Sequence, residues 1–182
     1  FPTRRSSDLL QVPGNYDESM NRRYPIGRFE TPAHTTTADR EAWIRDIEQL
    51  PVLLRQAVEE LPTEGIDRPY REGGWTARQL VHHVADSHIN AYMRLRLALT
   101  ETRPVIKTYR EAAWADLADA RAAEVEVSLR LIESLHERWA MLLRSLADEQ
   151  WERTFIHPEA GELSLAVATA MYSWHEIGRA YV

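Results

Sequence analysis

Apolar residues recur at spacings of three and four in four stretches of the chain, which is the period of an amphipathic helix. The pattern predicts four helices: from a cap at Thr37 or Asp39 to about Val58, from a cap at Thr76 to about Thr100, from about Ala122 to Leu146, and from Leu165 to Trp174. A short helical turn is expected near residues 111–117, and Pro51 is expected to kink the first helix. Four helices with short connections predict an all-α fold, a single four-helix bundle.

The segments between these helices are polar and rich in turn-forming residues. Residues 61–74 contain two prolines and three glycines, and the Gly-Gly pair before Trp75 is a stop signal ahead of the next helix. Residues 148–163, with Pro158 and Gly161, are predicted to form a loop. No segment shows the alternation of a strand, so no sheet is expected.

Composition narrows the classes of function. The formal net charge of −6 argues against nucleic acid as a partner. No apolar run approaches the roughly 18 residues of a membrane span, and no signal peptide follows Met20, so we expect a cytoplasmic protein that does not bind membranes. The chain has no cysteine, which excludes a disulfide, a thiolate ligand and a cysteine nucleophile.

Both ends of the chain resemble translated sequencing adapter. The adapter string TTC CCT ACA CGA CGC TCT TCC GAT encodes Phe-Pro-Thr-Arg-Arg-Ser-Ser-Asp, with which the chain begins, and GAG ATC GGA AGA GC encodes the Glu-Ile-Gly-Arg-Ala near its other end. We therefore expect residues 1–9 and 176–182 to be adapter translation, residues 10–19 to be upstream sequence, and residues 20–175 to be the native domain.

Three histidines within Val-His-His-Val-Ala-Asp-Ser-His, in the second predicted helix, indicate a metal site together with His175 far downstream. Residues three and four apart share a helix face, so His82 can neighbour Asp86, whereas His83 points elsewhere. One helix therefore cannot supply every ligand. A second imidazole one turn after His175 would complete the set, but that position is Arg179.

Several motifs, in order, resemble a known family. They are YPIGRFETP, RPYREGGWTARQLVHHVADSHINAYMRLRLALTE, RPVIKTYREAAW, SLHERWAMLLRSL and HPEAGELSLAVATAMYSWH. Together they resemble the YfiT branch of the DinB-like superfamily over nearly all of residues 24–175. The resemblance implies a four-helix bundle in an up-down-down-up arrangement. It also implies a divalent metal, zinc or nickel, held by three histidines, and an activity described as metal-dependent hydrolysis or bacillithiol transfer.

The resemblance also implies which residues hold the metal. His83 matches the first family ligand and His175 the second, while the position of the third carries Arg179. A catalytic site normally keeps three protein ligands beside its open position, so we expect this chain to bind metal weakly.

The remaining candidate residues have simpler interpretations. His82 and His88 are expected at the bundle edge and are left without an assigned role. His82 and Asp86 could simply form an exposed pair, and Asp86 could instead orient a metal-bound imidazole. Structural roles are expected for His136 and His157. The candidate core aromatics are Trp75, Tyr92, Trp114, Trp139 and Trp174, some of which could line a pocket. Arg71, Arg94 and Arg96 could meet an acidic substrate, but acidic neighbours in the chain are the simpler expectation.

Three functions fit these residues. The first is a metal-dependent transferase in which a small-molecule thiol, held as a thiolate, attacks an electrophilic small molecule. The second is a hydrolase that uses metal-activated water on a small amide or ester. The third is a metal-stabilised bundle without catalytic turnover. The sequence does not identify the thiol or the electrophile, and a homodimer through the faces of the bundle is compatible with it.

Overall fold

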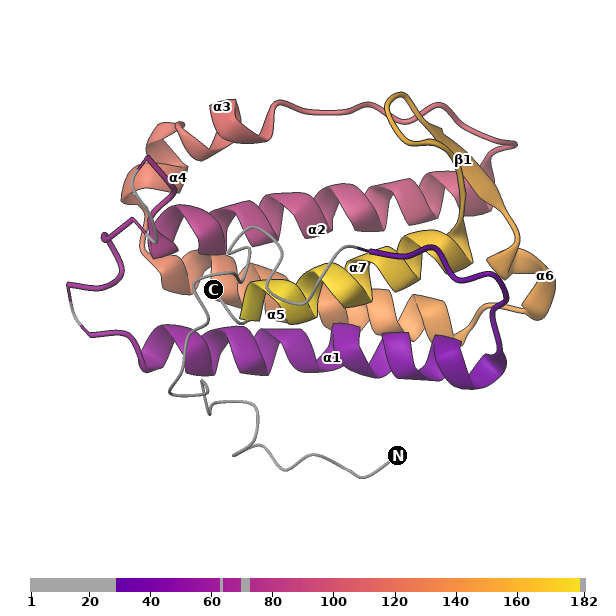
Figure 1. Ribbon diagram of the computed structural model, residues 1–182, viewed down its shortest axis with the longest axis horizontal. Helices are drawn as coiled ribbons and strands as arrows, with labels where there is room; N and C mark the ends of the chain where they lie inside the picture. The colour runs from indigo at the N-terminus through magenta and orange to yellow at the C-terminus, as the bar shows by residue number, and fades with distance from the viewer. Residues whose placement is uncertain (1–28, 63, 70–72, 181–182) are drawn as a thin grey trace.

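The computed structural model describes residues 29–62, 64–69 and 73–180, except for the side chains of residues 175–180. The four long helices lie side by side along the long axis (Figure 1): α1 (Thr37–Glu59), α2 (Ala77–Thr100), α5 (Val125–Arg144) and α7 (Leu165–Ala180). The short elements are α3 (Glu111–Ala115), α4 (Ala118–Ala122), α6 (Asp148–Trp151), β1 (Thr154–His157) and β2 (Gly161–Ser164). The predicted segments 1–9 and 10–19 lie outside the described residues, and the limits of the native domain stay a prediction.

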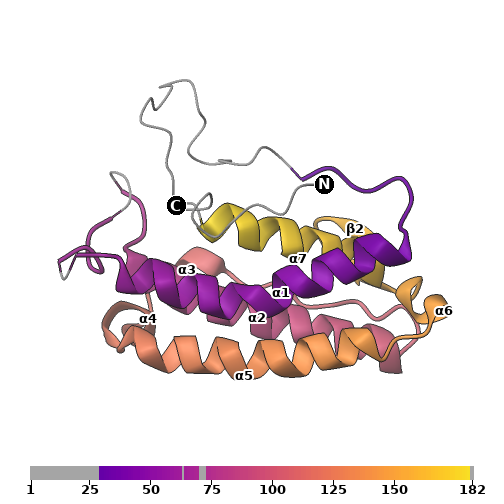
Figure 2. The same cartoon turned by 90° about the horizontal axis from the view of Figure 1, so that it is seen from below.

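The bundle has the expected up-down-down-up topology. Helices α1 and α7 run in one direction, and α2 and α5 run in the other (Figure 1). Helix α1 packs against α7 and α5, and α2 packs against α5. Because α2 and α5 are consecutive long helices that run in the same direction, residues 101–124 must return along the whole bundle. This crossing segment runs beside α2 and includes α3 and α4 (Figures 1 and 2).

The cap of helix α1 lies one residue before the first predicted cap, Thr37, and three before the second, Asp39. Thr36 is the N-cap, and its hydroxyl accepts a hydrogen bond from the Asp39 backbone N–H at 3.2 Å. The Asp39 carboxylate accepts from the Thr36 N–H in return, so Asp39 is the partner in a capping box and not the cap itself. The helix continues through Pro51, which has no N–H. The carbonyl of Ile47, four residues earlier, therefore lacks its usual helical donor.

Helix α2 begins as predicted, at the cap Thr76. Its capping-box partner Gln79 accepts from the Thr76 N–H at 3.0 Å, and the Gln79 amide also donates to the Ala115 carbonyl at 2.8 Å. The start of α2 is thereby tied to α3 in the crossing segment. This fixes the helix that carries three of the candidate histidines.

The prediction of a loop without strands over residues 148–163 is wrong. The segment contains α6 and an antiparallel hairpin in which Thr154 pairs with Ser164. Ile156 also exchanges hydrogen bonds with the crossing segment, donating to the Pro104 carbonyl at 2.9 Å and accepting from the Ile106 N–H at 3.0 Å. The hairpin thus has a third extended partner about 50 residues away in sequence, which a local pattern does not reveal.

Two apolar clusters fill the bundle. One joins α1, α2, α5, the hairpin and α7 around Trp139, and the other joins α1, α2 and α5 around Ile132. Trp114, predicted as a core aromatic, is instead 38% exposed and packs on Tyr109 of the crossing segment. No helix in the described part of the chain combines the length and apolar character needed to span a membrane.

Candidate metal centre

His83, the first predicted ligand, places a buried imidazole near the start of α2. Its side chain is 3% exposed, and its ring centre lies 4.7 Å from that of Trp75, with the planes tilted by 55°. Trp75 directly precedes the cap Thr76, so the residues that begin α2 also form an aromatic wall beside His83. A neutral imidazole offers a nitrogen lone pair of the kind that divalent metals bind.

His82 faces a different part of the molecule, and the prediction that it forms an exposed pair with Asp86 is wrong. Its Nδ1 lies 2.7 Å from the Ser128 hydroxyl, and its Nε2 lies 3.1 Å from the Ala123 carbonyl. The side chain is 6% exposed. One ring nitrogen therefore binds the start of α5 and the other binds the end of α4, so His82 holds this end of the bundle together.

The edge position predicted for His88 is also wrong, because this residue is fully buried in the core. Its Nδ1 lies 2.7 Å from Nε2 of His136, and Nδ1 of His136 lies 2.5 Å from the carbonyl oxygen of Ile47. This is the carbonyl that Pro51 leaves without a helical donor. A side chain from α5 thus replaces the missing backbone N–H of α1, which agrees with the structural role expected for His136.

The acceptor at the end of this chain fixes the protons along it. A carbonyl oxygen only accepts, so Nδ1 of His136 carries a hydrogen and donates it. Burial lowers the pKa of His136 to about 4, with partial opposition from the Ile47 hydrogen bond, so the ring is neutral near pH 7. Its Nε2 then accepts, and Nδ1 of His88 donates.

Two further candidate residues, Asp86 and His157, are partly exposed to solvent. Burial raises the pKa of Asp86, and the charge of Asp119 raises it further. Its role beside a metal-bound imidazole stays a prediction. His157 ends β1, and its Nδ1 accepts from the backbone N–H groups of Glu159 and Ala160, both at 3.2 Å. These bonds give His157 the structural role expected for it.

The second predicted ligand falls where only the backbone is described. His175 and Arg179 lie in helix α7, but their side chains are outside the described residues. The pairing of His83 with His175 therefore stays a prediction. Among the described side chains, no three His, Asp or Glu residues form a group that could hold a metal ion.

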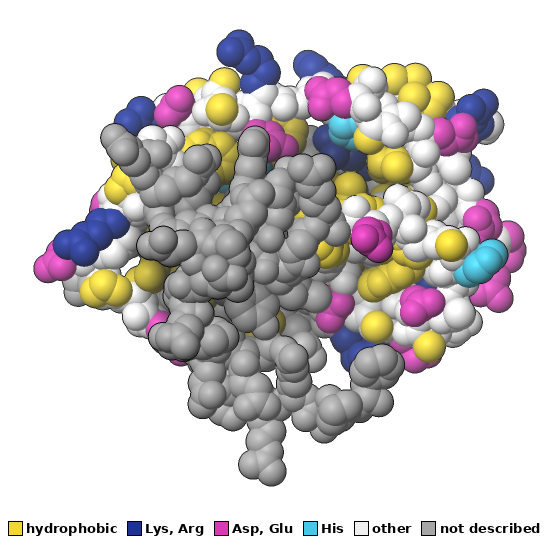
Figure 3. All heavy atoms as spheres, in the orientation of Figure 1, with side chains coloured by type: hydrophobic (Ala, Val, Ile, Leu, Met, Phe, Trp, Pro, Cys, Tyr) yellow, Lys and Arg dark blue, Asp and Glu magenta, His cyan; other side chains and the backbone are white. Residues whose placement is uncertain are grey.

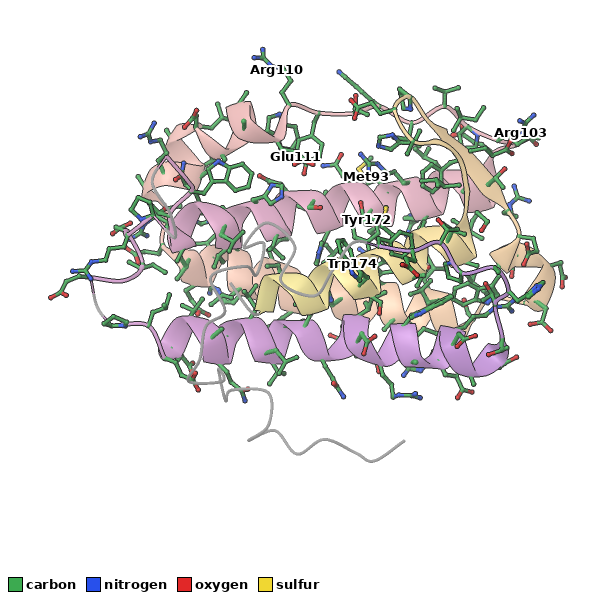
Figure 4. All side chains as sticks on the ribbon, in the orientation of Figure 1. Met93, Arg103, Arg110, Glu111, Tyr172 and Trp174 are labelled. Carbon is green, nitrogen blue, oxygen red and sulfur yellow. The ribbon has the colours of Figure 1, made fainter. Side chains whose placement is uncertain are left out.

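A small cavity lies between α2, α5, β1 and α7. The centre of a water molecule can occupy about 10 Å³ of it, so the cavity has room for about one water. Its lining residues are Ala91, Arg94, Leu95, Trp139, Phe155, Leu165, Ala168, Thr169 and Tyr172. Tyr172 points into the space between α2 and α7 (Figure 4). Arg94 Nη1 donates to the Tyr172 hydroxyl at 3.3 Å, so the guanidinium and the phenol join the two helices.

Acidic neighbours were expected for three arginines, and the structure differs for two of them. Neither Arg94 nor Arg96 forms an ion pair with a described carboxylate. Arg94 contacts the hydroxyl of Tyr172, and Arg96 donates to that of Tyr92 at 3.0 Å. Arg71 lies outside the described residues.

Sequence analysis missed the buried histidine pair and the cavity. A signal for the first was present, because a proline inside a helix implies an unpaired carbonyl that needs a donor elsewhere. The cavity had no such local signal, because its lining comes from four separate elements.

The chain matches the family model of the DinB superfamily over residues 46–180. It is 51% identical over 156 residues to a protein of Oceanobacillus iheyensis named "putative metal-dependent hydrolase", covering 86% of this chain and 90% of that protein. A Bacillus cereus protein of that name is 52% identical over 153 residues, which are 84% of this chain and 88% of the relative.

A solved structure gives a similar result. YfiT from Bacillus subtilis, described as "a probable metal-dependent hydrolase with an unusual four-helix bundle topology", is 43% identical to this chain. The superposition covers 88% of this chain and 92% of that one, with a TM-score of 0.85.

Proposed function

We propose, from the premise that this chain belongs to the DinB superfamily, that it is a divalent-metal-dependent enzyme acting on small molecules. The observation that carries the proposal is the buried imidazole of His83 beside Trp75, in a fold shared with relatives named as metal-dependent hydrolases. We propose that His83 and His175 hold the metal, which is zinc or nickel.

The donor set suits such an ion. Imidazole nitrogen is a preferred ligand of both zinc and nickel, and His83 is shielded from water, which strengthens a charged interaction. Position 175 follows Tyr172 by three residues, a spacing that shares a helix face. Tyr172 contacts Arg94 of α2, so that face of α7 is directed toward the helix carrying His83. The family's third ligand position carries Arg179 in this chain.

We propose S-transfer as the reaction. When bound, a divalent metal supplies the acidity that generates a thiolate or a hydroxide at neutral pH. The chain has no cysteine, so the thiol must come from a small molecule, which then attacks an electrophilic substrate. The residues of the chain bind the metal, orient the two reactants and exclude water from the site.

The second candidate is hydrolysis of a small amide or ester. It is favoured by the name given to the Oceanobacillus and Bacillus cereus relatives. The same imidazole ligands serve either reaction, because only the species that loses its proton differs.

Metal content and two parallel assays test the proposal. The purified chain is loaded with zinc or nickel, its bound metal is measured, and it is assayed for consumption of a low-molecular-weight thiol with an electrophile and for ester or amide hydrolysis. We expect metal-dependent thiol consumption, and we expect His83→Gln to abolish both metal binding and activity.

His82→Gln is the matched control. It changes the adjacent histidine, whose nitrogens bind Ser128 and Ala123, and it should keep the metal and the activity. Hydrolysis without thiol consumption would favour the second candidate. Bound metal with neither activity would contradict both and leave a metal-stabilised bundle.

A further inference from the structure

The cavity between α2 and α7 is lined by donors that have no acceptor. Arg94 Nε and Trp139 Nε1 are both buried, and neither has a hydrogen-bond partner among the described residues. Both side chains line the same cavity. An unpaired buried N–H is unfavourable, so two of them at one cavity indicate that an acceptor is missing.

Arg94 differs from Arg40 and Arg78, two other partly buried arginines, because no anion binds it in the described part of the chain. Arg40 and Arg78, whose side chains are 13% and 14% exposed, each hold an aspartate, at 2.8 Å and 2.7 Å. Arg153 donates to two backbone carbonyls. Arg94 has only the hydroxyl of Tyr172 as a partner in the described part of the chain. Its positive charge is therefore not neutralised by a bonded group.

Further polar groups surround Arg94. Burial lowers the pKa of His157, and the charge of Arg94 lowers it further, so this imidazole is neutral near pH 7. Figure 3 shows the surface of the molecule on the side seen in Figure 1. Burial raises the pKa of Tyr172, and the charge of Glu111 on the crossing segment adds to this effect. The floor of the cavity, formed by Phe155 and Leu165, is apolar.

Tyr172 sets the distance from this cavity to His83. Its hydroxyl interacts with both Ser87 and Arg94, which are seven residues apart on α2. The Arg94 side chain must therefore extend back along the helix toward Ser87, the direction that helical side chains favour. Ser87 is four residues from His83, a rise of about 6 Å. The Tyr172 hydroxyl that Arg94 contacts thus lies beside Ser87, one helical turn from the ligand position.

We propose that Arg94 and Trp139 form a carboxylate-binding site, and that the protein acts on a small molecule carrying a carboxylate. One oxygen of the carboxylate, in the space that holds about one water, accepts from the Arg94 guanidinium and from the Trp139 N–H, and Tyr172 holds Arg94 in position. A planar carboxylate matches the donors of arginine and suits a narrow cavity better than a tetrahedral phosphate. The placement of this carboxylate near the reacting group rests on the proposed metal function, whereas the carboxylate site itself does not.

Calorimetric titration of the full chain tests this site without using its activity. Hexanoate is compared with hexanamide, which has the same length and no charge, and with pentyl phosphate, before and after addition of zinc. We expect hexanoate to bind at least about tenfold more tightly than hexanamide. Arg94→Gln should weaken hexanoate binding about 10- to 100-fold, and Trp139→Phe should weaken it severalfold.

Arg96→Gln is the matched control, because Arg96 lies two residues away on α2 and contacts Tyr92 instead of the cavity. It should bind hexanoate as the unchanged chain does. If Arg94→Gln does not fold, Arg94→Lys tests the proposal in its place. Lysine keeps the positive charge but cannot form two parallel hydrogen bonds, so hexanoate affinity should fall severalfold.

Three results would overturn the proposal: equal binding of hexanoate and hexanamide, tighter binding of pentyl phosphate, or unchanged affinity in the Arg94 variants. Absence of binding by all three probes would mean that the cavity holds only a water. Each result is independent of the thiol and hydrolysis assays, so failure of the carboxylate site and failure of the proposed function are distinguishable.

Discussion

Replacing His136 with leucine should expose how α1 tolerates Pro51. The substitution removes the donor to the Ile47 carbonyl and the acceptor for His88 Nδ1, both of which lie in the core. Each unpaired buried group costs about 1–3 kcal/mol, so His136→Leu should lower the free energy of unfolding by about 2–5 kcal/mol. Leucine is close in size to histidine, so little of this loss should come from a cavity.

Pro51→Ala is the second substitution of a double-mutant cycle with His136→Leu. It restores the backbone N–H that can donate to Ile47 within α1, so it should recover about 1–3 kcal/mol in the His136→Leu background. In the unchanged chain the carbonyl already has a donor, and the same substitution should change stability by less than about 1 kcal/mol. The two substitutions are therefore expected to be strongly non-additive.

Urea unfolding of the four proteins in this cycle, followed by circular dichroism, measures the coupling. The cycle of His82→Leu with Pro51→Ala is the control and should be additive, because His82 binds Ser128 at the start of α5 and Ala123 at the end of α4. Additive losses in the His136 cycle, or a cost of His136→Leu below about 1 kcal/mol, would show that the histidine does not replace the proline's missing donor.

Three further predictions concern pH, metal and the hairpin. Burial lowers the pKa of His136 from 6.5 to about 4, so the unfolded chain binds a proton in this range that the folded chain does not. The contribution of His136 to the free energy of unfolding is therefore full above pH 6.5 and falls by up to about 3 kcal/mol as the pH drops to about 4. Acid titrations of His136→Leu should lack this fall in stability. Arg179→His should raise the affinity for zinc about 100-fold, which is about what one of four ligands contributes to a structural zinc site. Competition with a chelator measures this affinity, and an unchanged value would refute the proposed third position. Gly161 has φ +80° and no atom near an added Cβ, so Gly161→Ala should cost about 1–2 kcal/mol in urea unfolding through backbone strain alone.

The sequence predicts the long helices well because their signals are local. The capping residue Thr76 and the helical period after it locate α2 correctly. The hairpin fails as a prediction because Ile156 depends on Pro104 and Ile106, which are distant in sequence. Helical periodicity also gives no sign that the crossing segment would supply this partner.

The candidate site is likewise only partly predictable from the sequence. The family motif identifies His83, and the structure adds its burial and its contact with Trp75. His88 lies four residues after Val84 and three before Ala91, on the buried face of α2, so its spacing does indicate burial. Its partner His136 could not be predicted, because that residue lies on another helix. Arg94 was judged an ordinary surface partner of acids, since the sequence does not show that the nearby carboxylates fail to reach it.

The topology also governs the order in which the chain can fold during its synthesis. Helix α1 is made first among the long helices, but α7, against which it packs and whose Ser173 donates to Asp46 at 2.5 Å, is made last. A nascent chain therefore carries the side of α1 that packs on α7 uncovered until residues 165–180 have left the ribosome, although α5 can already cover another side of α1. We expect the bundle to close after translation and to depend until then on the chaperones that shield exposed apolar surface.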